Sequence, residues 1–227
     1  MISVIIPALN ESRALPATLA RLLAEPGPFE TIVVDGGSDD DTVAIASAHA
    51  GVRVITAPRG RARQMNAGAR SATGDLLLFL HADTLLPAGA MTRLRALAAD
   101  PDCIAGGFRH RFSGEDWRLR AISAIDNWRC ARTRIIYGDQ AMFVRRAMFE
   151  HLGGFPEQPD PYLEDVRFCE ALRRIARPVL LDETVVTDSR KFEKTGVWRA
   201  FARMSLVLAC HRLGMRTRGL AFFDAVR

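Results

Sequence analysis

The sequence lacks several features that mark whole classes of protein. Within its 227 residues, no apolar run approaches the roughly 18 to 20 residues that a membrane-spanning helix requires. No low-complexity segment and no internal repeat is visible, so nothing points to a repeat protein. The first residues contain neither a charged segment nor a cleavage site. We therefore expect no signal peptide and interpret Ile2–Ile6 as a first strand that Pro7 ends.

Cysteine is scarce, and a dinucleotide signature is missing. No two of the four cysteines form a CxxC pair, which argues against a zinc knuckle. We interpret them as small core residues of a protein in a reducing compartment, and we expect the protein to be cytoplasmic. No GxGxxG follows the first strand, which argues against a dinucleotide-dependent oxidoreductase.

The basic residues are concentrated at one end of an otherwise ordinary globular composition. Apolar residues make up 48% of the chain and charged residues 25%. Residues 190–227 contain nine Lys or Arg and two Asp or Glu, a net charge of +7, whereas residues 1–189 carry −2. Such a tail indicates contact with a membrane surface, nucleic acid or a phosphorylated substrate, or it is a solvated helical face. We predict one domain over residues 1–227.

Strands and helices alternate through the first hundred residues. This order with short links predicts a mostly parallel, Rossmann-like α/β sheet flanked by helices. The run Leu76–Leu80 is too continuous for a half-exposed strand and predicts a central strand buried on both faces. The other predicted strands are Phe29–Val34 and Val52–Thr56, and the predicted helices are Ala17–Ala24, Asp41–Ala50, Arg61–Ala72 and Pro87–Ala99.

The second half is less regular, and no linker separates it from the first. We expect it to complete the same domain. Its predicted strands are Ile104–Phe112, Ala141–Arg145, Val179–Leu181 and Val185–Val186, and its predicted helices are Asp116–Arg132, Glu164–Ile175 and Thr195–Leu213.

The turn after the buried strand contains His81 and Asp83. In extended backbone, residues two apart point the same way, so the imidazole and the carboxylate can hold Mn²⁺ or Mg²⁺. Such an ion neutralises charge on a departing diphosphate. The alternative is that Asp83 caps the next helix and His81 is a core residue.

Three further segments combine polar groups with a predicted turn or helix start. Asp35 precedes two glycines that let a ligand approach the backbone, although it can equally cap the next helix. Arg61 and Arg63 oppose the dipole of the helix they begin, which suggests that one faces an anion, although surface charge is the simpler explanation. Glu164 and Asp165 begin a later helix and are either capping residues or a source of the general base.

Taken in order, these segments resemble the family 2 glycosyltransferases of the GT-A fold. The motifs are VIIPALNES, IVVDGGSDDDT, GRARQMNAGA, LFLHADT, GDQAMFVRRAMFEHLGGF and YLEDVRFCEALR, and they cover about Ile2 to Arg174. LFLHADT stands where the family has its DxD metal motif. The chain looks closest to a small bacterial branch with LHADT and GDQ variants.

The resemblance implies a role for each matching position. It predicts an inverting transfer of a sugar from a UDP- or GDP-linked donor to an acceptor hydroxyl, with residues 1–100 binding nucleotide, 101–189 on the acceptor side and 190–227 as a helical tail. Asp165 would be the base and Glu164 its neighbour. Pro7, Asn10, Glu11, Asp35, Arg61, Arg63, Asn66 and His81 would bind the donor, Asp139 and Gln140 would lie on the acceptor side, and Asp83 with His81 would bind Mn²⁺ or Mg²⁺.

Two departures from the family pattern weaken part of this assignment. Gly36 replaces a second aspartate, and His81 replaces the first aspartate of the DxD motif, leaving one carboxylate for the metal. The tail residues from Arg190 to Lys194 are candidates for positive charge over the diphosphate.

Alternative functions are a nucleotidyltransferase and a non-catalytic, membrane-associated nucleotide- or sugar-binding protein. A nucleotidyltransferase would typically have a glycine-rich basic loop after the first strand, which this sequence lacks. A binding protein would not require a general base such as Glu164 or Asp165. We expect no nucleic-acid partner, and a lipid acceptor is left open. The predicted tail helix has Trp198, Phe201 and Leu208 at helical intervals, which fits docking onto the core, a homodimer, or peripheral contact with the inner face of the membrane.

Overall fold

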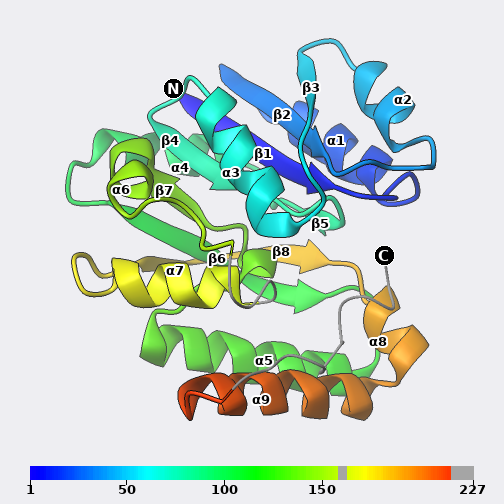
Figure 1. Cartoon of the computed structure of the whole chain (residues 1–227), viewed down its shortest axis with the longest axis vertical. Helices are drawn as coiled ribbons and strands as arrows, with labels where there is room; N and C mark the ends of the chain where they lie inside the picture. Colours follow the sequence, from blue (N-terminus) through cyan, green and yellow to red (C-terminus); the bar gives the residue numbers. More distant parts are fainter. Residues whose placement is uncertain (158–162, 216–227) are drawn as a thin grey trace.

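The computed structural model describes residues 1–157 and 163–215. Within that part of the chain, eight strands form one sheet in the order β3-β2-β1-β4-β7-β6-β8-β5, and helices cover it (Figure 1). The strands are β1 (Ile2–Ala8), β2 (Phe29–Asp35), β3 (Val52–Thr56), β4 (Leu76–Phe79), β5 (Thr84–Leu85), β6 (Ala105–Phe112), β7 (Phe143–Arg145) and β8 (Val179–Thr187). The helices are α1 (Leu15–Leu23), α2 (Thr42–Ser47), α3 (Arg61–Ser71), α4 (Ala90–Ala99), α5 (Trp117–Thr133), the 3₁₀ turn η1 (Gly138–Gln140), α6 (Arg146–His151), α7 (Glu164–Leu172), α8 (Arg190–Thr195) and α9 (Val197–Arg212).

The first half of the sheet is parallel, as the alternation of strands and helices predicts. β1 pairs with β2 and with β4, and β2 pairs with β3, all in parallel. β4 is buried along its whole length. The prediction that Pro7 ends the first strand is wrong, because β1 continues to Ala8. Proline is tolerated there because the pairing of β1 with β4 stops at Ile5, so no ladder hydrogen bond is lost on that side.

The second half of the sheet is mixed. β7 lies antiparallel between β4 and β6, and β8 runs parallel to β6. The two short strands predicted between Val179 and Val186 are one strand, with Asp182 and Glu183 as an extra pair opposite the Phe108–Arg109 step. The short β5 pairs antiparallel with β8 and ties the turn after β4 to the second half of the chain.

Two layers of apolar side chains lie on the two faces of the sheet. On one face, α1 and α4 bury Leu15, Leu19 and Met91 against β1 and β4. On the other face, α3, α6 and α7 pack around a group of phenylalanine rings whose centroids lie 4.8 to 5.3 Å apart. Burial of this kind is the main source of stability in a domain of this size.

The tail docks onto a smaller third cluster. α9 confirms the predicted helix Thr195–Leu213. A shorter helix, α8, precedes it, and Gly196 separates the two with a φ of +86°. Phe192, Val197 and Ala200 pack there against β6 and α5, and α9 lies beside α5 (Figure 1). In the described part of the chain, no helix is both long and apolar enough to cross a membrane.

Candidate active site

The carboxyl ends of β1, β2 and β4 meet at one edge of the sheet, where ligands of such sheets usually bind. The loops after β1 and β2 are tied together by Asn10, whose N–H donates to Ser38 Oγ (2.9 Å) and whose Oδ1 accepts from Asp39 N–H (2.9 Å). The carboxylate of Asp35 accepts hydrogen bonds from Gly37 and Ser38 within the same turn. Both predicted donor residues therefore shape the rim of this edge.

A small polar cavity opens between the ends of β1 and β4. Its empty volume is about 380 Å³. Gln64 on α3 closes its floor by donating from Nε2 to the carbonyls of Ala8 (2.8 Å) and Val34 (2.9 Å). The lining residues are Pro7, Ala8, Leu9, Glu11, Arg61, Gln64, His81, Ala82 and Asp83. We call it the β1–β4 cavity.

A larger cavity lies beside it, toward α9. Its empty volume is about 890 Å³, including its open mouth. Arg61 and His81 line both cavities, so they form the shared wall. The other residues that line this α9 cavity are Phe112, Tyr137, Gly138, Asp139, Leu163, Asp165, Val166, Thr187, Asp188, Phe192, Met204, Val207 and Leu208.

Arg190, at the start of α8, contacts two residues that line the β1–β4 cavity. Its guanidinium pairs with the carboxylate of Glu11 and lies 3.6 Å from Asp83 Oδ2. Although partial burial opposes the charge, these carboxylates raise the pKa of Arg190 above its usual value. The tail therefore brings a permanent positive charge to the residues predicted to hold the diphosphate and the metal.

Asp165 and Glu164 begin α7 and are buried beside Arg61. Glu164 is fully buried and forms an ion pair with Arg61 Nε. Asp165 Oδ2 accepts from Gly138 N–H at 2.7 Å, and its Oδ1 accepts from Val166 N–H at 2.7 Å. Burial raises the pKa of Asp165 to about 6, because the loss of water and the Glu164 charge outweigh the Arg61 charge and the two hydrogen bonds.

Gly138 lies between His81 and Asp165. A Cβ at this position would lie 2.6 Å from His81 Nε2 and 3.4 Å from Asp165 Oδ2. Only glycine therefore lets the imidazole lie against the turn whose N–H holds the carboxylate. This arrangement brings the carboxyl end of β4 close to the first residues of α7, although the two elements are far apart in the sequence.

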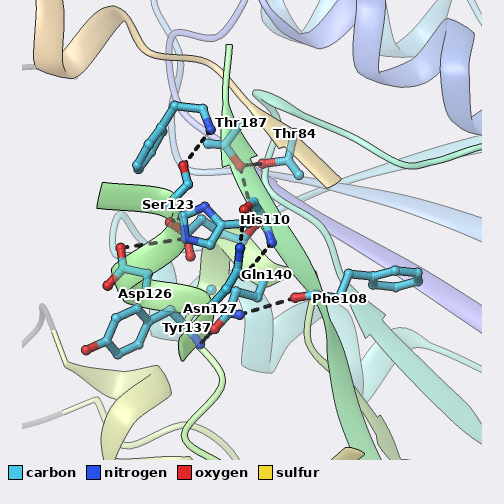
Figure 2. A network of polar contacts seen from close by, with 12 residues as sticks. Thr84, Phe108, His110, Ser123, Asp126, Asn127, Tyr137, Gln140 and Thr187 are labelled. Atoms are coloured by element: carbon cyan, nitrogen blue, oxygen red, sulfur yellow. Dashed lines mark hydrogen bonds and ion pairs between the residues drawn. The ribbon is translucent and has the colours of Figure 1, made fainter. Parts of the chain in front are cut away.

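A buried polar network holds the turn that contains Gly138, between Tyr137 and Gln140, against β6 (Figure 2). Strand β7 covers only the first residues of β6, and further along that edge side chains replace a strand. Asn127 on α5 pairs with both the N–H (3.0 Å) and the carbonyl (2.9 Å) of His110. Gln140 of η1 donates to the carbonyl of Phe108 (3.2 Å) and accepts from Tyr137 N–H (3.0 Å).

His110 joins two carboxylates inside this network. Its Nε2 lies 3.6 Å from Asp126 Oδ2, and its Nδ1 lies 3.9 Å from Asp139 Oδ2. The imidazole is fully buried, which lowers its pKa, but the two carboxylates outweigh burial and raise the pKa above its usual 6.5. The network therefore connects α5 to Asp139, which lines the α9 cavity.

The structure does not bring every predicted site residue to the cavities. Asn66 is buried and exchanges hydrogen bonds with the backbone of Phe155 (2.9 Å each), which pins the turn after α6. Arg63 lies 3.6 Å from Glu157, and Gln140 is fully buried. Neither cavity is lined by Asn10, Asp35, Arg63, Asn66, Gln140 or Glu164.

The sequence interpretation missed several residues of the site. Gly138 could have been found, because it is the first residue of the GDQ motif. His110 and Thr187 lie in strands with no motif around them, and Phe192 gave no signal beyond its apolar character. Only the folding of the tail over the sheet edge makes Phe192, Met204 and Leu208 part of the α9 cavity.

Solved structures with this arrangement identify the fold as that of GT-A glycosyltransferases. S. aureus TarS (residues 1–349) has a TM-score of 0.67 and 20% identity, over 89% of this chain and 65% of that one. The mannosyltransferase PcManGT from Pyrobaculum calidifontis, solved with GDP-Man and Mn²⁺, has a TM-score of 0.62 and 24% identity, over 82% of this chain and 56% of that one. The predicted fold class is confirmed.

The chain belongs to glycosyl transferase family 2, whose sequence profile matches residues 3–153. An uncharacterized glycosyltransferase of Mycobacterium tuberculosis is 33% identical over 59% of this chain and 60% of its own length. A PGL/p-HBAD biosynthesis glycosyltransferase of the same organism is 36% identical over 68% of this chain and 63% of its own length. The matched segment thus spans about 60% of the length of these relatives. Membership favours the predicted enzyme over the nucleotidyltransferase and non-catalytic alternatives.

Proposed function

We propose that this protein transfers a sugar from a nucleotide-diphosphate donor to an acceptor hydroxyl, with inversion at the anomeric carbon. One observation carries the proposal. Two cavities share a wall made by Arg61 and His81; Asp83 lines one of them and Asp165 lines the other. A donor in the β1–β4 cavity and an acceptor in the α9 cavity would meet at this wall, which is the proximity that a direct displacement needs.

The β1–β4 cavity suits the diphosphate part of the donor. Arg61 begins α3, where the free N–H groups of a helix favour an anion, and Arg190 adds a second positive charge from the tail. TarS has been solved with UDP and with UDP-GlcNAc, and PcManGT with GDP-Man. By analogy we propose a UDP- or GDP-linked sugar as the donor, with Asn10 and Asp35 at the rim toward the base.

We propose that Asp83, with His81 beside it, holds Mn²⁺ or Mg²⁺. In the described residues, no three His, Cys, Asp or Glu side chains converge on one point. This fits an ion that takes one or two ligands from the protein and the rest from phosphate and water, as Mg²⁺ commonly does. When bound, the ion stabilises negative charge on the departing diphosphate.

Asp165 is the proposed general base. It lines the α9 cavity next to the shared wall, and its raised pKa suits proton abstraction near neutral pH. The acceptor oxygen gives its proton to Asp165 and forms a bond to the anomeric carbon. At the same time the bond from that carbon to the diphosphate oxygen breaks, and the diphosphate leaves with the electron pair. Arg61, paired with Glu164, stays charged and faces the negative charge that develops.

The α9 cavity suits an acceptor with an apolar part. Asp139 and Asp165 line it, and the part that α8 and α9 contribute, its apolar end, consists of Phe192, Met204, Val207 and Leu208. An apolar lining binds an apolar group through the hydrophobic effect, so we propose that the reactive hydroxyl belongs to an amphipathic molecule. Phe112, Leu163 and Val166 add to the apolar lining.

A thermal-shift panel tests the donor assignment. UDP-, GDP- and TDP-sugars are each added with Mn²⁺, Mg²⁺ or EDTA. We expect one family of donors to raise Tm in proportion to the logarithm of its concentration, with a larger rise when metal is present. Asp83→Ala should lose the metal-dependent part of that rise, whereas Asp102→Ala, an exposed aspartate far from the cavities, should keep it. If no nucleotide sugar changes Tm with any metal, the proposed function is wrong.

A further inference from the structure

The outer face of α5 and α9 exposes an unusual share of the large apolar side chains. The chain has three tryptophans, and all of them lie there, each 51 to 62% exposed. Ile125 and Leu206 on the same helices are 48% exposed. Of the ten large apolar side chains exposed in the described residues, five are on these two helices. We call Trp117, Ile125, Trp128, Trp198 and Leu206 the tryptophan face.

These side chains form one surface. α5 and α9 lie side by side (Figure 1), and the rings of Trp117 and Trp198 are 6.2 Å apart at the start of the two helices. Trp117 and Trp128 are eleven residues apart, about three turns of a helix, so they point the same way. The inner faces of both helices are buried against β6 and the core, so the tryptophan face points away from the fold.

The exposed charged side chains within α5 and α9 are positive. α9 has three arginines and no acidic residue. The only acidic residue of α5 is Asp126, which is buried against His110. Arg132 stacks on the ring of Trp128, with its guanidinium carbon 5.1 Å from the ring centroid. The exposed arginines on the two helices are Arg120, Arg132, Arg199, Arg203 and Arg212.

We propose that the tryptophan face docks onto the surface of an anionic lipid bilayer. Trp side chains favour the boundary between lipid and water, and arginines beside them attract anionic headgroups. A second copy of the chain fits this face less well, because a twofold interface would place arginine against arginine on helices with no exposed acid. Of the three apolar residues that lie at helical intervals in the predicted tail helix, only Trp198 belongs to this face. Phe201 is half-buried in the third cluster, and Leu208 lines the α9 cavity.

α9 thus has two functions in this proposal. Met204, Val207 and Leu208 point into the α9 cavity, whereas Trp198 and Leu206 point outward. Docking would bring the apolar end of the cavity close to the bilayer. The inference does not depend on the proposed reaction, because binding to lipid is measured without donor or acceptor.

Flotation with lipid vesicles tests the proposal on the full-length protein. We expect the protein to float with phosphatidylcholine vesicles that contain phosphatidylglycerol and to bind weakly to phosphatidylcholine alone. Because all the tryptophans lie on the face, their fluorescence should shift to the blue on binding. Arg199→Gln and Arg203→Gln should each weaken partitioning about fivefold, whereas Arg70→Gln on α3 should not.

A second pair of variants separates the face from overall stability. Trp117→Ser with Trp198→Ser should abolish flotation while leaving Tm nearly unchanged, because both side chains are mostly exposed. Ile175→Ser, at another exposed apolar position, should float like the parent. The proposal is overturned if anionic vesicles neither bind the protein nor shift its fluorescence. It is also overturned if light scattering finds a dimer that the double variant dissociates, or if RNA rather than lipid shifts the fluorescence.

Discussion

At the scale of single residues, Asp165 is held in a way that suits a base. Two backbone N–H groups fix both of its oxygens, and Gly138, which supplies one of them, leaves room for His81 where a Cβ would clash. The carboxylate is thereby oriented without losing all its basicity, since burial raises its pKa to about 6. Such restraint of a reactive group lowers the cost of reaching the transition state.

Replacing Asp165 with asparagine should separate binding from turnover. The amide fills the same space but accepts no proton, so we expect kcat to fall by about 100- to 10,000-fold while donor-induced thermal shifts persist. Nucleotide release in the presence of acceptor measures the loss, and Asp102→Asn provides a matched control. Full activity in Asp165→Asn would remove this residue as the base.

The pH profile should follow the raised pKa of Asp165. A base works only when deprotonated, so kcat/KM should rise with pH through about 6 and level off above that value. An aspartate with its usual pKa of 3.8 would give a kcat/KM that stays unchanged until a far lower pH. A profile that is flat between pH 5 and pH 7 would contradict the assignment.

Gly138→Ala gives a sharper residue-scale test. The new methyl group would meet His81 Nε2 at 2.6 Å, so either the imidazole or the turn must move. The φ of Gly138 is not positive, so an alanine backbone is not strained there. We therefore expect a fold that survives and a kcat that falls at least tenfold. Gly153→Ala, with open space around its Cβ but a positive φ, should lose some stability and retain turnover.

At the scale of elements, the edge of β6 is completed by side chains instead of a strand. Asn127 and Ser123 from α5 and Gln140 from η1 bond to its backbone, so α5 and the 3₁₀ turn are positioned by the same strand. His110 adds charge to this junction by facing Asp126 and Asp139. A substitution that disturbs this junction should therefore alter the α9 cavity through Asp139.

His110→Asn should destabilise the protein in a pH-dependent way. It removes the cation between the buried Asp126 and the partly exposed Asp139, at a cost of about 1 to 3 kcal/mol. Because the pKa of His110 is raised in the folded state, its stabilisation is complete below pH 6.5 and is lost as pH rises through the raised value. Urea unfolding at several pH values should show that the difference in free energy of unfolding between the variant and the parent becomes smaller as pH rises. A difference in free energy of unfolding that does not change with pH would mean that His110 is neutral. His151→Asn, a substitution at an exposed position, is the control.

At the scale of the whole molecule, the tail completes two sites that the sheet alone leaves open. α8 brings Arg190 to Glu11 and Asp83, and α8 with α9 forms the apolar end of the α9 cavity. The proposed donor and acceptor sites are therefore both covered by the tail. This arrangement couples the position of the tail to both halves of the proposed reaction.

Acceptors with a hydroxyl on an alkyl or aryl body should react better than free sugars. Each buried methylene contributes about 0.8 kcal/mol, so kcat/KM should rise about fourfold per carbon until the cavity is full. Phe192→Ala should flatten this dependence, whereas Leu213→Ser, an exposed position after α9, should leave it unchanged. Equal rates for all chain lengths would contradict an apolar acceptor site.

Much of the first half of the chain, which is predicted to bind nucleotide, could be predicted from local patterns. Apolar runs separated by turns predicted β1 to β4 and their parallel order, because burial on two faces needs continuous apolar residues. The motif residues Glu11, Arg61, His81 and Asp83 do line one cavity. Short pairings such as β5 with β8 could not be predicted, because two residues carry no periodicity.

The sequence by itself determined which residues have chemistry to offer and that a buried parallel sheet presents several of them at one edge. Only the tertiary structure decided their partners: Gly138 between His81 and Asp165, His110 between two carboxylates, and Arg190 beside Asp83. The physical reason is one of range. Hydrophobic periodicity acts over a few residues, whereas desolvation, ion pairing and close packing join positions as much as 179 residues apart, as with Arg190 and Glu11.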